Sequence, residues 1–231
     1  MEKTMPRLNR LFAVTALLAL CAGAACAEET DRALPAPALD TQAAQQQPTE
    51  TAVLAGGCFW GMQGVFQHVK GVKQVWAGYS GGNAPDAHYD MVGTGDTGHA
   101  ESVKIVFDPK LVSFGQILRV YFSVMDPTKL NYQGPDYGSQ YRSEVFAVNP
   151  VQQHITQAYI AQLAKAFSAP IVTKVGSFKA FYAAEGYHQD YLINHPNQPY
   201  IAINDLPKIA KLKQLYPQLY VDKPVTVARN N

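Results

Sequence analysis

The chain has 231 residues, of which 47% are hydrophobic and 11% aromatic, and its formal net charge at pH 7 is +1. A charge so close to zero provides no basic surface for a nucleic acid, and that class of partner is excluded. The length suits one compact domain with short extensions, and the sequence contains no internal repeat.

Residues 1–27 have the three parts of a secretory signal. A basic start precedes an apolar run over residues 11–20, and a small-residue cleavage site follows at Ala25-Cys26-Ala27. The run is about half of the ~20 apolar residues that a membrane-spanning helix requires. We therefore expect export to the periplasm or the exterior and a mature chain from Glu28, with acylation of Cys26 as the alternative. Cleavage removes three of the 19 basic and one of the 18 acidic residues, so the net charge becomes −1.

The remaining chain divides into a linker, a domain and a tail. Residues 28–50 contain three prolines, a glutamine run and no aromatic residue, so we predict a disordered linker that buries little. Residues 51–218 are predicted to form the one domain, and residues 219–231 a C-terminal tail. We expect a monomer.

Hydrophobic periodicity predicts a mixture of strands and helices within the domain. Hairpin-like neighbours rather than strict βαβ alternation favour an α+β fold: a mainly antiparallel mixed sheet with packed helices and a ferredoxin-like two-layer core. The predicted strands are residues 53–55, 74–79, 102–107, 145–148 and 171–175, and the predicted helices are residues 59–69, 113–124 (capped by Ser113) and 151–167.

The sequence Gly56-Gly57-Cys58-Phe59-Trp60-Gly61 places a cysteine at the start of a predicted helix. Of the three cysteines, Cys21 and Cys26 lie in the predicted signal, so the mature chain can form no internal disulfide. A thiol at a helix N-terminus is favoured as thiolate by the helix dipole and by free N–H groups. Because glycine allows close approach of a ligand, we predict that Cys58 is a nucleophile rather than a buried structural residue.

Two large aromatic residues, Phe59 and Trp60, follow this cysteine directly. Adjacent helical residues do not share a face, so at least one of them is expected to line a pocket for a small apolar group rather than pack into the core.

The segment Gly93–Glu101 contains a G-x-G-x-x-G pattern, but a strand rather than a helix is predicted after it, so we reject nucleotide binding. Glu101 stands at the entrance of that strand. A carboxyl group beside apolar walls has a raised pKa and can serve as a general acid at neutral pH; the alternative is a solvated strand-end carboxylate.

Two further polar motifs have ordinary surface interpretations. Asp136, Tyr137 and Tyr141 are expected in a loop, and Arg142 with Glu144 would form a solvated ion pair. His188, in a Tyr-His-Gln-Asp-Tyr sequence, would be an exposed helical histidine unless the fold brings it to a site. The six histidines show no metal-ligand spacing, so no zinc site is expected.

Taken together and in order, the motifs resemble the A-type peptide methionine sulfoxide reductases over about residues 51–197. The motifs that carry the resemblance are Gly57-Cys58-Phe59-Trp60-Gly61, Gly78-Tyr79-Ser80-Gly81-Gly82, Gly98-His99-Ala100-Glu101, Gly138-Ser139-Gln140-Tyr141-Arg142-Ser143 and Tyr187-His188-Gln189-Asp190-Tyr191.

This resemblance implies an oxidoreductase that repairs oxidised proteins. It implies that Cys58 attacks the sulfur of the S epimer of methionine sulfoxide, with Glu101 as the acid. The remaining roles that it implies are hydroxyls from Tyr89 and Tyr141 holding the oxygen, Phe59 and Trp60 around the methyl group, Asp136 supporting the site and His188 lining it. The product on Cys58 would be a sulfenic acid.

The sequence departs from that family at three places. Gln63 stands where a glutamate is common, Gly93 stands where many relatives have a cysteine, and the tail after Leu206 lacks resolving cysteines. We therefore expect one-cysteine turnover, in which an external small thiol or a thioredoxin-like protein, and no bound cofactor, reduces the sulfenic acid.

Two other functions compete with this interpretation. Cys58, His99 and Asp136 could be the nucleophile, base and orienting group of a cysteine hydrolase or acyltransferase. An inactive relative could use the same pocket to bind methionine-containing peptides.

Overall fold

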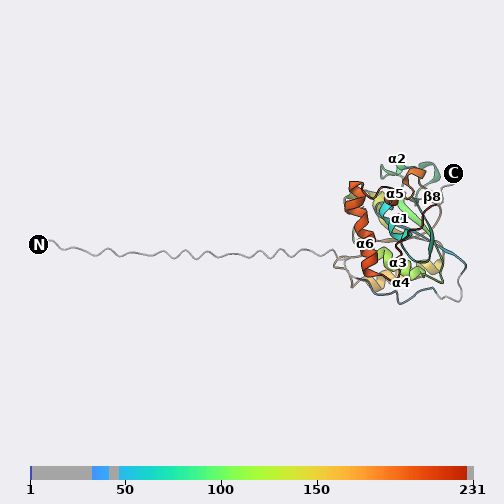
Figure 1. The fold of residues 1–231 in the computed structure, drawn as a ribbon, viewed down its shortest axis with the longest axis horizontal. Coiled ribbons are helices and arrows are strands. Elements are labelled where there is room, and N and C mark those ends of the chain that lie inside the picture. Colours follow the sequence, from blue (N-terminus) through green and yellow to red (C-terminus); the bar gives the residue numbers. More distant parts are fainter. Residues whose placement is uncertain (2–32, 42–46, 228–231) are drawn as a thin grey trace.

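The fold is taken from a computed structural model, which describes Met1 and residues 33–41 and 47–227 (Figure 1). Apart from Met1, the predicted signal over residues 1–27 lies outside the described residues. The strands are β1 (Glu50–Gly56), β2 (Val72–Ser80), β3 (Ala100–Phe107), β4 (Tyr132–Gln133), β5 (Asp136–Tyr137), β6 (Ser143–Ala147), β7 (Lys174–Ser177) and β8 (Phe181–Ala183). The helices are α1 (Phe59–Gln67), α2 (Tyr89–Val92), α3 (Phe114–Val124), α4 (Pro150–Leu163), α5 (Tyr191–Asn194) and α6 (Leu206–Leu215).

Six strands form one sheet in the order β7-β6-β1-β3-β2-β8, and β4 pairs with β5 in a separate hairpin. Every pairing in the large sheet is antiparallel except that between β6 and β7. This confirms the predicted mixed, mainly antiparallel sheet with packed helices.

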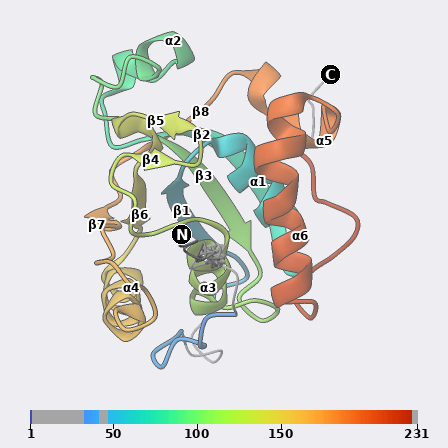
Figure 2. The same cartoon turned by 90° about the vertical axis from the view of Figure 1, so that its left-hand side faces the viewer.

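The two faces of the sheet bury different residues because side chains alternate along a strand. On β1, Leu54 packs into the main core with α1 and α3, whereas Val53 belongs to a small cluster on the other face. On β3, Val103, Ile105 and Phe107 all face the main core. Helices α1 and α6 lie side by side over this core (Figure 2).

The predicted helix after residue 113 is confirmed with its cap. Ser113 accepts a hydrogen bond from the N–H of Gln116, and the Gln116 side chain accepts one from the N–H of Ser113, so both partners of a capping box are present. Helix α4 begins at Pro150, where a missing N–H costs nothing, and ends at Leu163, four residues before the predicted end.

The last predicted strand is displaced. We predicted residues 171–175, but β7 covers Lys174–Ser177, where the chain can pair in parallel with β6. Edge strands of this kind are defined by their partner more than by their own sequence.

Residues 33–41 differ from the predicted linker because they lie against the domain. Leu34 is 1% exposed, and its backbone N–H donates to the hydroxyl of Tyr216 while its carbonyl accepts from Arg119. Asp40 accepts from Ser113 and from the N–H of Gly115 at the start of α3. The segment buries one large apolar side chain and satisfies its backbone, which composition alone did not suggest. We call residues 33–41 the N-terminal strap.

No helix in the described part of the chain is both long and apolar enough to cross a bilayer.

Candidate active site

The turn between β1 and α1 presents Cys58 at the start of the helix. Cys58 is the residue that caps α1, as predicted, and it is 6% exposed. Gly57 has a φ of 90°, and a Cβ there would lie 2.6 Å from the Cβ of Gln133. Only glycine combines this backbone conformation with that close approach. The turn is therefore held tightly against the β4–β5 hairpin.

The electrostatic environment of Cys58 favours the thiol over the thiolate. Burial raises its pKa well above 9.0, and the charges of Glu101 and Asp205 raise it further. Lys208 and a hydrogen bond from the backbone of Trp60 act in the opposite direction. The predicted help from the helix N-terminus is present but is outweighed by desolvation. The sulfur must lose its proton when the site reacts.

Glu101, the second residue of β3, faces the same turn. One carboxyl oxygen accepts a hydrogen bond of 2.9 Å from the N–H of Phe59, and the side chain is buried. Burial raises the pKa of Glu101 to about 8, although the hydrogen bond from Phe59 lowers it. At neutral pH the group is therefore mainly a carboxylic acid. Glu101 thus contacts the backbone of the residue that follows Cys58, and it is not a solvated strand-end carboxylate.

Three more groups of the predicted site meet around Glu101. Tyr89 begins α2, Asp136 begins β5, and Tyr141 ends a 3-10 turn over Ser139–Tyr141. Burial raises the pKa of both tyrosines, and the charge of Glu101 raises them further, so their hydroxyls stay protonated donors. Asp136 also has a raised pKa because it is partly buried, and it accepts a hydrogen bond from Tyr200.

An aromatic wall stands on the other side of the thiol. The ring of Trp60 stacks on Tyr191 with centroids 4.0 Å apart, and its Nε1–H donates to Nδ1 of His188 at 3.2 Å. His188 is buried, lies 5.1 Å from the ring of Phe59 and 4.4 Å from that of Tyr89, and has a pKa lowered by burial. The fold therefore brings His188 to the site, and it holds the indole as a neutral imidazole.

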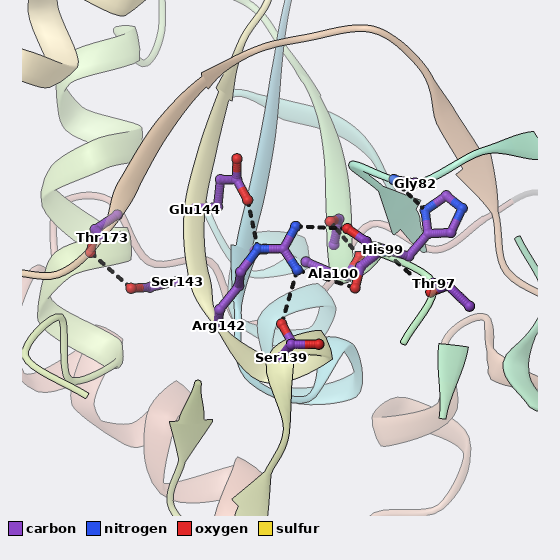
Figure 3. A network of polar contacts seen from close by, with 12 residues as sticks. Gly82, Thr97, His99, Ala100, Ser139, Arg142, Ser143, Glu144 and Thr173 are labelled. Atoms are coloured by element: carbon purple, nitrogen blue, oxygen red, sulfur yellow. Dashed lines mark hydrogen bonds and ion pairs between the residues drawn. The ribbon is translucent and has the colours of Figure 1, made fainter. Parts of the chain in front are cut away.

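The predicted surface ion pair is instead buried. Arg142 and Glu144 are 8% and 9% exposed, and Nε of Arg142 lies 2.7 Å from a carboxyl oxygen of Glu144. The other guanidinium nitrogens donate to the carbonyls of Gly98, His99 and Ser139 (Figure 3). Through these hydrogen bonds, the Arg142 side chain connects the segment before β3 to the segment around Tyr141. The two segments that carry Glu101 and Tyr141 are thereby fixed to each other.

The histidine of the competing hydrolase interpretation has no free nitrogen. Nδ1 of His99 accepts from the N–H of Gly82 at 3.2 Å, and Nε2 lies 2.9 Å from the carbonyl of Asn83. A ring held in this way supports the loop and cannot take a proton from Cys58.

Comparison with known proteins gives one family. Residues 50–219 match the family model described as peptide methionine sulfoxide reductase. The chain belongs to the peptide methionine sulfoxide reductase family. It is 61% identical over 182 residues to peptide methionine sulfoxide reductase MsrA 2 of Mesorhizobium japonicum, covering 78% of this chain and 93% of the relative. It is 47% identical to the protein of that name from Synechocystis, covering 86% and 95%.

A solved structure agrees with this assignment. The methionine sulfoxide reductase A of Corynebacterium diphtheriae superposes with a TM-score of 0.60 at 32% identity, covering 73% of this chain and 85% of that one. The family predicted from the motifs is therefore confirmed.

Three residues of this reductase that the sequence did not indicate also reach the site. Tyr200 contacts both Asp136 and the edge of Trp60, with the ring centroids of Tyr200 and Trp60 6.0 Å apart. Asp205 is fully buried against Gly61 and pairs with Lys208 at 2.8 Å. The three residues, Tyr200, Asp205 and Lys208, lie more than 130 positions after the Cys58 motif, and no local sequence pattern indicates their role. Only a π-helical turn over Ile201–Asp205, a feature frequent at functional sites, distinguishes the segment.

The hydrogen bonds of Gln63 explain one departure from the family pattern. Its amide nitrogen donates to the carbonyl of Val75 at 2.9 Å, and its amide oxygen accepts from the N–H of Asp190 at 2.9 Å. An ionised carboxylate could accept but not donate, so the amide suits these partners.

Across residues 33–41 and 47–227, no three or more His, Cys, Asp or Glu side chains are grouped as a metal site.

Proposed function

We propose that this protein reduces the S epimer of methionine sulfoxide to methionine, with Cys58 as the nucleophile and Glu101 as the proton donor. The observation that carries the proposal is the placement of the buried Glu101 carboxyl group, whose pKa burial raises to about 8, against the first turn of the helix that Cys58 caps. Membership of the peptide methionine sulfoxide reductase family supports the same reaction.

The reaction transfers one oxygen from sulfur to sulfur. The Cys58 sulfur, after losing its proton, attacks the sulfoxide sulfur while Glu101 protonates the sulfoxide oxygen. The S–O bond then breaks, and the hydroxyl passes to Cys58 as the new bond between the two sulfurs breaks and leaves its electron pair on the methionine sulfur. The proton lost by Cys58 restores the acid form of Glu101. The sulfoxide is reduced to the thioether, and Cys58 is oxidised to a sulfenic acid. Protonation matters because an oxide ion would be a very poor leaving group.

The surrounding residues hold the two ends of the reacting group. Tyr89 and Tyr141 supply hydroxyl donors for the oxygen, because both remain protonated beside Glu101. Phe59 and Trp60 form an apolar wall for the methyl group. His188 accepts a hydrogen bond from the indole of Trp60 and fixes its position. Asp136 supports the part of the site that carries the tyrosine hydroxyls, through the hydrogen bond that it accepts from Tyr200.

Recycling depends on an external thiol. A first thiol condenses with the sulfenic acid to give a mixed disulfide and water, and a second thiol releases Cys58 and leaves as a disulfide. Cys58 is the one cysteine in the described part of the chain, and it is free. A thioredoxin-like protein or a small thiol therefore serves as reductant, and oxidised proteins are the expected substrates.

We also propose the organisation of the whole chain. An exported protein with a signal over residues 1–27 and a catalytic domain over residues 51–218 accounts for the basic and apolar start and for the matched range 50–219. A ferredoxin-like core is supported by the antiparallel order β6-β1-β3-β2, in which α1 connects β1 to β2 and α3 precedes β6.

The test is reduction of each epimer of methionine sulfoxide in a short blocked peptide with excess dithiothreitol. We expect the protein to consume only the S epimer, Cys58→Ser to abolish the reaction, and Glu101→Gln to slow it by roughly 10²–10⁴-fold. Asp96→Asn, an exposed carboxyl change just before β3, is the control and should react like the unaltered protein.

Other results would favour other functions. Consumption of neither epimer by folded protein would refute the proposal. A Cys58→Ser variant that retained full function in cells would instead favour a binding role.

A further inference from the structure

A groove opens directly beside the proposed active site. Its volume is about 450 Å³, and it runs between residues 124–136 on one side and residues 200–211 on the other. Asp136 and Tyr200 line the groove and also contact each other at the edge of the Cys58 site. A polypeptide whose methionine sulfoxide occupied that site could therefore continue into the groove without leaving the surface. We call this feature the flanking groove.

Apolar side chains line much of the flanking groove. They are Val124, Met125, Tyr132, Pro135, Ile203 and Pro207. The lining residue Ile203 is 71% exposed, and Leu130, which follows the lining residue Lys129 in the chain, is 58% exposed. Tyr137 is 72% exposed and stacks on Tyr132 with ring centroids 4.9 Å apart. Large apolar residues gathered at one edge of a functional site are typical of a surface that another chain covers.

Two of the three lysines that line the groove pair with aspartates. Lys129 lies 3.7 Å from a carboxyl oxygen of Asp126, and Lys208 lies 2.8 Å from Asp205. The walls therefore do not form a field of one sign, and an apolar ligand fits them better than a charged one.

The base of the groove is rigid. Gln133 donates to the carbonyl of Asp126 at 2.6 Å and accepts from its N–H at 3.1 Å, and its side chain packs against Gly57 next to Cys58. The groove is therefore preformed and keeps a fixed position relative to the nucleophile.

We propose that the flanking groove binds an apolar side chain of the polypeptide next to the methionine sulfoxide. Among oxidised polypeptides, the preferred substrate is then an extended segment in which an apolar residue such as leucine adjoins the methionine sulfoxide. This inference rests on the proposed function, because the groove gains its role from the substrate at Cys58. Methionines of protein cores have apolar neighbours and meet the enzyme only when the chain unfolds.

The experiment compares kcat/KM for the S epimer in four substrates with excess dithiothreitol. They are N-acetylmethionine sulfoxide and blocked tripeptides with serine on both sides, with leucine before, and with leucine after the sulfoxide. The full chain is compared with Ile203→Asp and with Val151→Asp, a control at an exposed residue of α4 that does not line the groove.

We expect one leucine peptide to exceed the serine peptide by about tenfold in the unaltered protein and in Val151→Asp. Ile203→Asp should bring that ratio below about two, while N-acetylmethionine sulfoxide keeps its kcat/KM within about twofold. Equal rates for leucine and serine peptides, or a ratio that Ile203→Asp leaves unchanged, would overturn the inference. If even N-acetylmethionine sulfoxide is not reduced, the proposed function itself has failed, and the two failures are thereby distinguished.

Discussion

At Glu101, burial and hydrogen bonding act on the same proton in opposite directions. Loss of solvent favours the neutral acid, whereas the N–H of Phe59 favours the carboxylate, and burial dominates to give a pKa of about 8. The same loss of solvent holds the proton on Cys58. The resting site therefore keeps both protons, and for Glu101 this lowers the free energy of unfolding at neutral pH.

That cost predicts a pH-dependent gain from Glu101→Gln. Glu101 binds its proton more tightly in the folded protein than in the unfolded chain, so its stabilising effect is complete below pH 4.5 and is lost as the pH rises to about 8. Glutamine does not titrate. The free energy of unfolding of the variant should therefore rise relative to that of the unaltered protein between pH 5 and 8, by about 3–4 kcal/mol. Urea unfolding at pH 5, 6.5 and 8 measures this.

The control for this effect is Asp96→Asn, because Asp96 is exposed. Its stability difference from the unaltered protein should be constant over the same pH range. A constant difference for Glu101→Gln as well would contradict the raised pKa.

Substitutions of Asp205 and Lys208 are expected to change the reactivity of Cys58 in opposite directions. The aspartate raises the pKa of the thiol and the lysine lowers it. Asp205→Asn should therefore speed alkylation of Cys58 by iodoacetamide at pH 8.5, and Lys208→Met should slow it, each by about three- to tenfold. Mass spectrometry of the Cys58 peptide gives the rates. If both variants change the rate in the same direction, access rather than charge controls the thiol.

Local patterns were sufficient for some site residues and insufficient for others. Cys58 and Glu101 could be assigned roles from their neighbours, since glycines, aromatics and a strand entrance surround them. Nothing near Tyr200 or Asp205 marks them, because their role depends on where the chain returns after more than 130 residues. The burial of Arg142 was not predicted for a related reason. Its partners include backbone carbonyl groups, which no sequence pattern reveals.

At the scale of elements, the buried ion pair connects segments that no strand pairing joins. Arg142 precedes β6, and its guanidinium contacts the loop that enters β3 and the turn that ends at Tyr141. A planar group with several donors can satisfy several carbonyls and one carboxylate at once. It thereby sets the spacing between β3, which carries Glu101, and the turn that carries the hydroxyl of Tyr141.

Removal of the Arg142 side chain is expected to lower the free energy of unfolding strongly. Arg142→Met would leave the carboxylate of Glu144 buried without its partner, and such changes cost about 3–5 kcal/mol in free energy of unfolding. Lys73→Met breaks an exposed pair with Asp108, at 3.6 Å, and should cost less than about 1 kcal/mol. Urea unfolding of both variants compares them. Equal small losses would show that the buried pair is not needed to fix the two segments.

Element prediction succeeded where burial on one face imposes a period. Strand β3 and helix α3 were predicted closely, since Val103, Ile105 and Phe107 alternate and a capping serine begins the helix. Helix α6 was missed because two of its residues, Ile209 and Leu212, are its only buried ones. The position of β7 is set by its pairing with β6, and the sequence of β7 alone does not indicate that pairing.

For the whole molecule, the N-terminal strap and the active site lie at opposite ends. The strap passes beneath α3 and α4, whereas α2, β5 and α5, which carry Tyr89, Asp136 and Tyr191, lie at the other end (Figure 2). The strap also lies outside the range 50–219 that matches the family. It adds contacts to the domain without touching the site, so its contribution should be to stability alone.

Leu34→Ala tests this separation of stability from activity. Leu34 is 1% exposed among residues that include Tyr216, so its truncation should lower the free energy of unfolding by about 2–4 kcal/mol. Leu39→Ala, in the same strap but 40% exposed, is the matched control and should cost less than about 0.5 kcal/mol. Both variants should keep kcat/KM for the S epimer within twofold at a temperature where they are folded. A drop in kcat/KM for Leu34→Ala alone would mean that the strap acts on the distant site through the main core, since Leu34 packs in the same cluster as Phe59 and Met62.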